Sequence, residues 1–251
     1  MKRKPLQGLI NVLRFNWHFF ALALAGIVSL RAGARWLAPD LLPIATVLAG
    51  AGSLIVGLSL AATVYAYDFS GLYSLRWLDP WLSGAVRAVN IHAGFDETSL
   101  LLKEKHPSVE WQVFDFYDPA KHTEISIKRA RAAHPLQPGT RTISTGRIPL
   151  ERQALDRIVL MLAAHEIRDR HERITFFREL HRVLADNGRV IVTEHLRDFQ
   201  NLIAYTLGAW HFLSRPEWLT TFEAAGFEIA AEIKANLFIT TFILRKHGTT
   251  P

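Results

Sequence analysis

The side chains best suited to proton transfer in this sequence are two histidines, each next to a glutamate. A neutral imidazole exchanges protons near physiological pH, so His165 and His195 are candidate general bases. The alternative is that both are polar residues at strand ends whose hydrogen bonds are made by neighbours. We expect Glu194 to order a loop rather than to perform acid–base chemistry.

The pair His165-Glu166 could also begin a zinc-binding helix. The His-Glu-x-x-His pattern needs a second histidine three positions after the glutamate, and His171 lies too far along the chain. The sequence has 0 Cys, which excludes disulfides, thiolate nucleophiles and Cys-ligated metals. We therefore expect no metal site.

A second group of candidates lies in the turn at residues 90–97. In an open parallel sheet a ligand binds beyond the first strand, where a glycine-containing turn lets the backbone approach it. Gly94 supplies that turn, and Asp115 follows about 20 residues later, where an acid accepts hydrogen bonds from ribose hydroxyls. His92 either contacts the ligand or fills the space that a further glycine would leave open.

The candidate residues must be positioned by secondary structure. After residue 85, short apolar runs alternate with helix-like stretches. The pattern predicts an α/β domain with a mostly parallel sheet and helices on both faces. We expect Asn187-Gly188 to form a left-handed stop between a helix and the next strand. The expected strands are 88–91, 111–114, 157–162, 189–193, 227–233 and 238–244, and the expected helices are 99–105, 171–184 and 216–225.

The first 67 residues have a different composition. Residues 41–67 carry no charged side chain. This uncharged segment is longer than the about 20 residues that a helix needs to cross a bilayer. Residues 15–30 form a second span if the flanking arginines extend toward the interfaces, with residues 31–39 as connector. We expect a two-helix membrane anchor at 1–67; the alternative for residues 1–34 is a cleaved signal peptide.

Basic residues near the N-terminus outnumber those of the connector, which favours a cytoplasmic N-terminus. We therefore expect a multi-pass protein of a cell inner membrane, with residues 85–251 facing the cytoplasm. Residues 68–84 are expected to form an interfacial linker or, compatibly, an amphipathic segment packed on the following domain. The basic segment 122–147 is either a solvated face or a contact to anionic lipid headgroups. It lacks base-stacking aromatics, so we expect no nucleic-acid partner, and the sequence does not define an oligomeric state.

The second half of the chain resembles a known family, the Rossmann-like (class I) S-adenosylmethionine-dependent methyltransferases. The segments that carry the resemblance are LDRIVL at 155–160, AHEIRD at 164–169, FFRELHRVLADNGRVIVTEH at 176–195, SRPEWL at 214–219 and FEAAGFE at 222–228. The resemblance covers residues 86–246.

By this resemblance, Gly94 lies beside the methionine part of S-adenosylmethionine, Asp115 on its ribose and Phe116 near its adenine. Residues from Ala163 to Glu166 would line the transfer site. Three positions of the first turn depart from the family pattern: an Asp is usual where Asn90 stands, and glycines are usual where His92 and Asp96 stand.

Together these features predict a membrane-anchored methyltransferase that acts on a lipophilic acceptor. In-line displacement on a sulfonium mainly requires alignment of donor and acceptor, so few dedicated catalytic residues are needed. The substituted turn leaves two alternatives open. One is a membrane-tethered scaffold or binding protein with this fold, and the other is an enzyme that uses the same cofactor for different chemistry.

Overall fold

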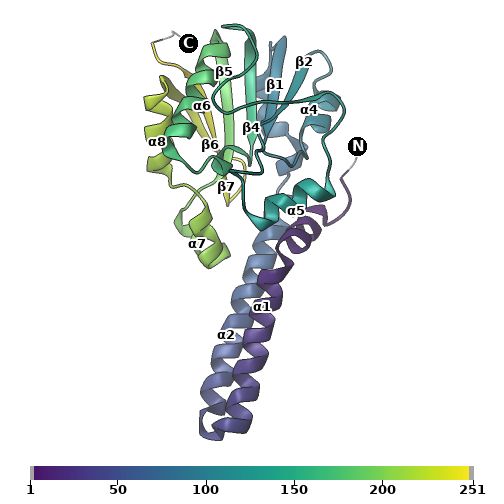
Figure 1. Ribbon diagram of the computed structural model, residues 1–251, viewed down its shortest axis with the longest axis vertical. Coiled ribbons are helices and arrows are strands. Elements are labelled where there is room, and N and C mark those ends of the chain that lie inside the picture. Colours follow the sequence, from purple (N-terminus) through teal and green to yellow (C-terminus); the bar gives the residue numbers. More distant parts are fainter. Residues whose placement is uncertain (1–2, 249–251) are drawn as a thin grey trace.

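The computed structural model describes residues 3–248 and has a seven-stranded sheet at its centre (Figure 1). The strand order is β3-β2-β1-β4-β5-β7-β6, and only β7 runs antiparallel to both of its neighbours. The expected α/β fold with a mostly parallel sheet is thus confirmed. The strands are β1 (Arg87–His92), β2 (Glu110–Asp115), β3 (Thr140–Thr142), β4 (Leu155–Met161), β5 (Leu184–His195), β6 (Phe227–Lys234) and β7 (Ile239–Lys246).

Helices cover both faces of the sheet because the central strands are apolar on both sides. One face packs against α6 (Arg170–Val183) and α8 (Arg215–Ala224), whose aromatic side chains Phe176, Phe177 and Trp218 are fully buried. The other face packs against α4 (Ser99–Lys105) and the short helical turns of residues 65–82. This segment, expected to be an interfacial linker, buries Leu72, Leu75, Leu78 and Leu82 on the sheet.

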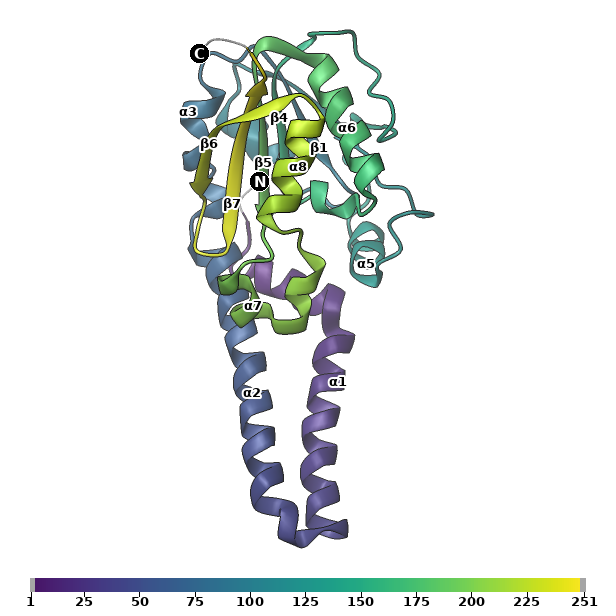
Figure 2. The same ribbon diagram turned by 90° about the vertical axis from the view of Figure 1, so that its left-hand side faces the viewer.

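Two long helices project together from the edge of the domain that holds the carboxyl ends of the parallel strands (Figures 1 and 2). They are α1 (Gln7–Leu37) and α2 (Leu42–Val64), joined by the short turn η1 (Pro39–Leu41). Both helices are long and apolar enough to cross a membrane, and only 6% and 11% of their most apolar windows are buried. Helices from the core of a soluble domain would be mostly buried, whereas most side chains of these two helices are exposed.

The first residues of α1 pack against the α/β domain. The Asp68 carboxylate accepts hydrogen bonds from the backbone N–H groups of Gly8 (2.8 Å) and Leu9 (3.0 Å), which the first turn of a helix leaves unpaired. A Cβ at Gly8 would lie 2.3 Å from Cβ of Tyr67, so only glycine permits this crossing. The first two turns of α1 therefore lie at the carboxyl ends of the strands.

Several sequence predictions need correction. The first long helix continues through residues 31–37, which were expected to form the connector, and the chain reverses only at 38–41. Asn187-Gly188 does not stop a helix: α6 ends at Val183 and β5 continues through Gly188. A Cβ at Gly188 would lie 2.6 Å from Cδ1 of Leu184, so close approach explains this glycine. Among the strands and α-helices after residue 85, three were not predicted: β3, α5 (Ile125–Ala133) and α7 (Phe199–Tyr205).

Candidate functional site

The turn after β1 brings Gly94 against Asp115. Gly94 has a φ of +83°, and its N–H donates to Asp115 Oδ1 at 2.8 Å. A Cβ at Gly94 would lie 2.9 Å from Cγ of Tyr117, which covers the turn. The glycine is therefore required by its left-handed backbone and by the ring above it.

The Asp115 carboxylate is fully buried. Oδ1 also accepts from the Tyr117 N–H at 2.9 Å, and Oδ2 accepts from the Arg131 guanidinium at 2.6 Å. His92 lies on the same carboxylate, with Nδ1 3.6 Å from Oδ1. The position expected for a ribose is thus closed by side chains of the protein.

The other substituted residues of the first turn have structural contacts. The Asn90 amide donates to the hydroxyls of Thr98 (3.0 Å) and Ser99 (2.7 Å), and Asp96 Oδ1 accepts from the backbone N–H groups of the same two residues. These contacts hold the turn against the start of α4. Burial lowers the pKa of His92, and the Asp96 and Asp115 carboxylates only partly offset this.

At the end of β4, His165 is held by two glutamates. Its Nδ1 donates to Glu194 Oε2 at 2.6 Å, and its Nε2 lies 3.5 Å from Glu166 Oε1. Burial disfavours an imidazolium, but the two carboxylates outweigh it and raise the pKa of His165 to about 10. In this arrangement His165 is a positively charged imidazolium at neutral pH. It would have to release one of its two ring protons before acting as a base.

Glu194 also shapes the loop that carries His165, which confirms its expected ordering role. Its Oε1 accepts from the backbone N–H groups of Ala163 (3.2 Å), Ala164 (2.8 Å) and His165 (3.3 Å). Leu162, just before these residues, has a left-handed φ of +53°. Non-glycine residues rarely adopt this conformation, and such strain gathers at functional sites.

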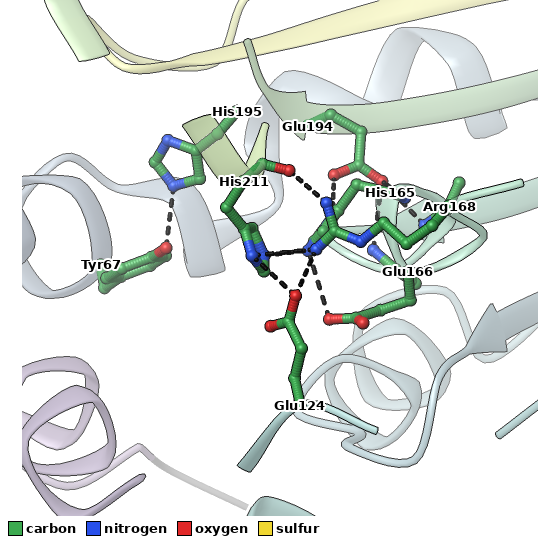
Figure 3. A network of polar contacts seen from close by, with 10 residues as sticks. Tyr67, Glu124, His165, Glu166, Arg168, Glu194, His195 and His211 are labelled. Atoms are coloured by element: carbon green, nitrogen blue, oxygen red, sulfur yellow. Dashed lines mark hydrogen bonds and ion pairs between the residues drawn. The ribbon is translucent and has the colours of Figure 1, made fainter. Parts of the chain in front are cut away.

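The second candidate base, His195, belongs to a separate network (Figure 3). Its Nδ1 donates to Asn201 Oδ1 at 2.9 Å, and its Nε2 accepts from the Tyr67 hydroxyl at 2.8 Å. These two bonds fix one neutral tautomer. Burial lowers the pKa of His195 to about 4, and the positive charge on His165 adds to the effect.

Three further polar residues join His165 that the sequence analysis did not single out as site residues. His211 comes from the turn η6 (Thr206–His211), and its ring centroid lies 5.3 Å from that of His165. Glu124 Oε1 lies 3.0 Å from Nδ1 of His211 and 2.8 Å from the Arg168 guanidinium. Figure 3 shows the three side chains grouped beside His165 and Glu166. They are far apart in the sequence and follow no spacing rule, so no local pattern marks them.

Two pockets open at this end of the sheet. The first, of about 200 Å³, lies between α1, α5 and the ends of β1 and β4; among its lining residues are Asn11, Phe15, Ala93, Met161, His165 and Glu166. The second, of about 230 Å³, lies beyond β2 and β3 and is lined by Phe116, Tyr117 and Ile143 among others. Of the expected site residues, His165 therefore lines the first pocket and Phe116 the second. The other expected residues line neither pocket: Asn90, His92, Gly94, Asp96, Asp115, Ala163 and His195.

The strand order and the site at the carboxyl ends of β1, β2 and β4 define a class I methyltransferase fold. No protein family model matches the chain, and no curated protein matches it by sequence. Among solved structures, it is similar to a SAM-dependent methyltransferase from Aquifex aeolicus, with a TM-score of 0.50 and 15% identity over 76% of this chain and 96% of that one. At this identity the likeness shows the fold.

Two further solved structures have lower TM-scores. The PH0226 protein from Pyrococcus horikoshii has a TM-score of 0.49 and 13% identity over 69% of this chain and 89% of that one. A SAM-dependent methyltransferase from Mesorhizobium loti has a TM-score of 0.46 and 16% identity over 70% of this chain and 98% of that one.

Proposed function

We propose that this protein is a membrane-anchored S-adenosylmethionine-dependent methyltransferase with a lipophilic acceptor. The observation that carries the proposal is the pocket of about 200 Å³, which α1 shares with the ends of β1 and β4. In open α/β folds this edge of the sheet is where ligands bind. Here one wall of the pocket belongs to a helix that is suited to a bilayer.

The lining of this pocket suits an acceptor with a polar end and an apolar body. Val12, Phe15 and Ile127 provide apolar surface from α1 and α5, whereas His165 and Glu166 provide charge at the end of β4. An acceptor dissolved in the bilayer would reach such a pocket along α1. Confinement of enzyme and acceptor to one membrane raises their effective concentration.

The cofactor would be held by Gly94, Asp115 and Phe116, with Ala163 at the transfer site. S-adenosylmethionine supplies an electrophilic methyl group when bound. The second pocket, lined by Phe116 and Tyr117, lies next to Asp115 and is the space available for an adenine. The Tyr117 backbone N–H and the Arg131 guanidinium, however, already bond the Asp115 carboxylate, and the Tyr117 ring covers Gly94. The residues do not fit the cofactor until the Arg131 and Tyr117 side chains move, so we derive no catalytic step through it.

This closed position favours a second candidate function: a membrane-tethered binding protein of methyltransferase fold that uses no S-adenosylmethionine. The two functions differ in one measurable property, the affinity for S-adenosylmethionine. We would titrate S-adenosylmethionine and S-adenosylhomocysteine into the detergent-purified full chain by calorimetry, with Asp115→Asn as the matched variant. The variant keeps the shape of the side chain but removes its charge.

Micromolar binding that weakens at least tenfold in Asp115→Asn would support the methyltransferase and justify a screen of lipid and quinone acceptors. The loss of one charged hydrogen-bond partner accounts for a change of about that size. A folded wild-type sample that gives no heat up to millimolar ligand would refute it and support the binding protein.

A further inference from the structure

The polar cluster beside the first pocket contains a set of metal-ligand atoms. His165, Glu166 and His211 each offer one nitrogen or oxygen atom, and these atoms all lie within 4.8 Å of one another. Two of the residues follow β4, and the third comes from η6. We propose that these three side chains bind a divalent transition-metal ion. This site does not depend on the proposed methyl transfer.

The spacing of the atoms suits such an ion. Imidazole nitrogen and carboxylate oxygen bind Zn²⁺ at about 2.0–2.2 Å, and a tetrahedral arrangement then separates neighbouring ligand atoms by about 3.4 Å. His165 Nε2 and Glu166 Oε1 already lie 3.5 Å apart. Only His211 needs to approach. Its side chain is 30% exposed on a short turn, and it must leave its present contacts with Glu124 and Arg168 to do so.

His165 is oriented as a metal-binding histidine usually is. Metal-ligating imidazoles donate their second N–H to a carboxylate or carbonyl, which fixes the ring and raises its basicity. The Nδ1 of His165 makes this contact with Glu194 at 2.6 Å. Glu194 is itself held by hydrogen bonds that it accepts from three backbone N–H groups. The His165 ring is therefore fixed in orientation, with Nε2 pointing toward Glu166.

The charges around the site leave room for a cation. Glu124, Glu166 and Glu194 contribute three negative charges, and Arg168 and the protonated His165 contribute two positive charges. Coordination through Nε2 releases the proton that His165 holds there, and a divalent ion then neutralises the two negative charges that remain. Arg168 now donates to Glu124 at 2.8 Å and to the backbone carbonyl of His211, and its Nη2 lies 2.9 Å from Nδ1 and 3.0 Å from Nε2 of His211. The guanidinium must therefore leave the imidazole when the ion binds, and its side chain, which is 39% exposed, has solvent to turn into.

The donor set indicates the class of metal. Two imidazoles with a carboxylate suit Zn²⁺ and neighbouring first-row ions, whereas Mg²⁺ and Ca²⁺ prefer oxygen ligands throughout. Three protein ligands leave at least one coordination position open. His165 and Glu166 both line the pocket of about 200 Å³, so that position faces the space proposed for the acceptor.

The test is direct metal binding by the full chain. Tag-free protein in detergent would be stripped with EDTA, dialysed and titrated with ZnCl₂ by calorimetry, and Co²⁺ would be added to a second sample as a spectroscopic probe. We expect one Zn²⁺ per chain with a micromolar or tighter Kd. The visible absorption of Co²⁺ should indicate a four- or five-coordinate site.

Glu166→Gln and His211→Gln are the informative variants, because both keep side-chain volume near the surface of the cluster. Each should weaken Zn²⁺ binding at least tenfold, since losing one ligand of three removes a large share of the affinity. His171→Ala, an exposed histidine on α6, is the matched control and should bind as the wild type does. Circular dichroism would show that the variants are folded.

Two results would overturn the site. One is a folded wild-type protein that takes up less than a tenth of an equivalent of Zn²⁺ at 100 µM metal. The other is uptake that neither Glu166→Gln nor His211→Gln weakens, which would place the ion elsewhere. Because no cofactor or acceptor is present, failure here leaves the proposed methyl transfer to its own calorimetric test.

Discussion

The Arg131 guanidinium donates to Asp115 Oδ2 at 2.6 Å, so the acid at the end of β2 is paired with a residue of α5. Asp115 has no exposed surface, and the Arg131 side chain is 24% exposed. A cofactor ribose would compete with Arg131 for the same oxygen. The state that binds the cofactor is then only a fraction of the population, and the apparent affinity falls by that fraction.

Arg131→Ala should therefore tighten S-adenosylmethionine binding. We expect a gain of about tenfold, because the substitution frees Asp115 Oδ2 without touching the turn at Gly94. It should also lower the free energy of unfolding by about 1–3 kcal/mol, since a charged hydrogen bond to a buried group is lost. Calorimetric titration and denaturant unfolding in detergent measure the two effects.

Lys128→Ala is the control for this prediction. Lys128 is exposed on the same helix, so its loss tests whether a lower positive charge on α5 alone changes binding. Weaker binding by Arg131→Ala would show that the arginine assists the cofactor instead of closing its site.

The central part of the fold could be predicted because its strands are short apolar runs with few competing interpretations. The expected helix 99–105 coincides with α4, and the other expected elements of the domain differ from the observed ones mainly at their ends. β3 has only three residues, all polar and at the edge of the sheet, so it has no apolar signal. α5 was hidden for a related reason: its lysine and arginines suggested a solvated segment.

The candidate site was predicted only where it follows strand ends. Gly94, Asp115 and His165 are positioned by the chain direction of β1, β2 and β4, so their place could be expected from the pattern of strands. Arg131 and His211 reach the same edge from α5 and η6 through tertiary packing. Their positions depend on the conformation of two loops, which no local spacing encodes.

Glu97 ties the start of α1 to the turn after β1, and its loss should release that segment. Both carboxylate oxygens accept hydrogen bonds, from Arg3 (2.8 Å), Gln7 (2.9 Å), Asn11 (3.0 Å) and Tyr73 (2.9 Å). Glu97→Gln should destabilise the protein by about 2–4 kcal/mol, because charged hydrogen bonds of a largely buried group are lost together. Hydrogen exchange at residues 3–11 should rise, as measured by mass spectrometry.

Glu110→Gln is the control, because it removes an exposed glutamate from β2. It should change neither the free energy of unfolding nor the hydrogen exchange at residues 3–11. If exchange at residues 3–11 stays slow in Glu97→Gln, the packing of Phe15 and the capping by Asp68 suffice to hold the segment, and Glu97 is not its main attachment.

The absence of cysteine makes the proposed membrane topology directly testable. Leu37, at the far end of the hairpin, is 88% exposed, and Lys128 is exposed on the domain. In intact cells, a membrane-impermeant maleimide should label Leu37→Cys, whereas Lys128→Cys should react only after permeabilisation. The reason is the excess of basic residues at the domain end of α1, which favours the cytoplasmic side. The reverse labelling pattern would invert the topology, and equal labelling of both would rule out a crossing.

His195 should make the protein sensitive to acid. Burial lowers the pKa of this histidine to about 4 in the folded chain, against 6.5 for an ordinary histidine. Between these values the unfolded state binds more protons than the folded state, so the free energy of unfolding falls as the pH falls. The difference of about 2.5 pH units corresponds to about 3 kcal/mol, and the contribution is fully present only above pH 6.5.

His195→Gln can still donate to Asn201 and accept from Tyr67, but it does not titrate. We expect the wild type to lose about 2–3 kcal/mol more than the variant between pH 7 and pH 4.5, measured by denaturant unfolding in detergent. The comparison cancels the carboxylates and the other histidines, which both proteins share. Equal losses in the two proteins would mean that His195 takes up its proton in the folded state, and the neutral tautomer fixed by Tyr67 and Asn201 would then not persist in acid.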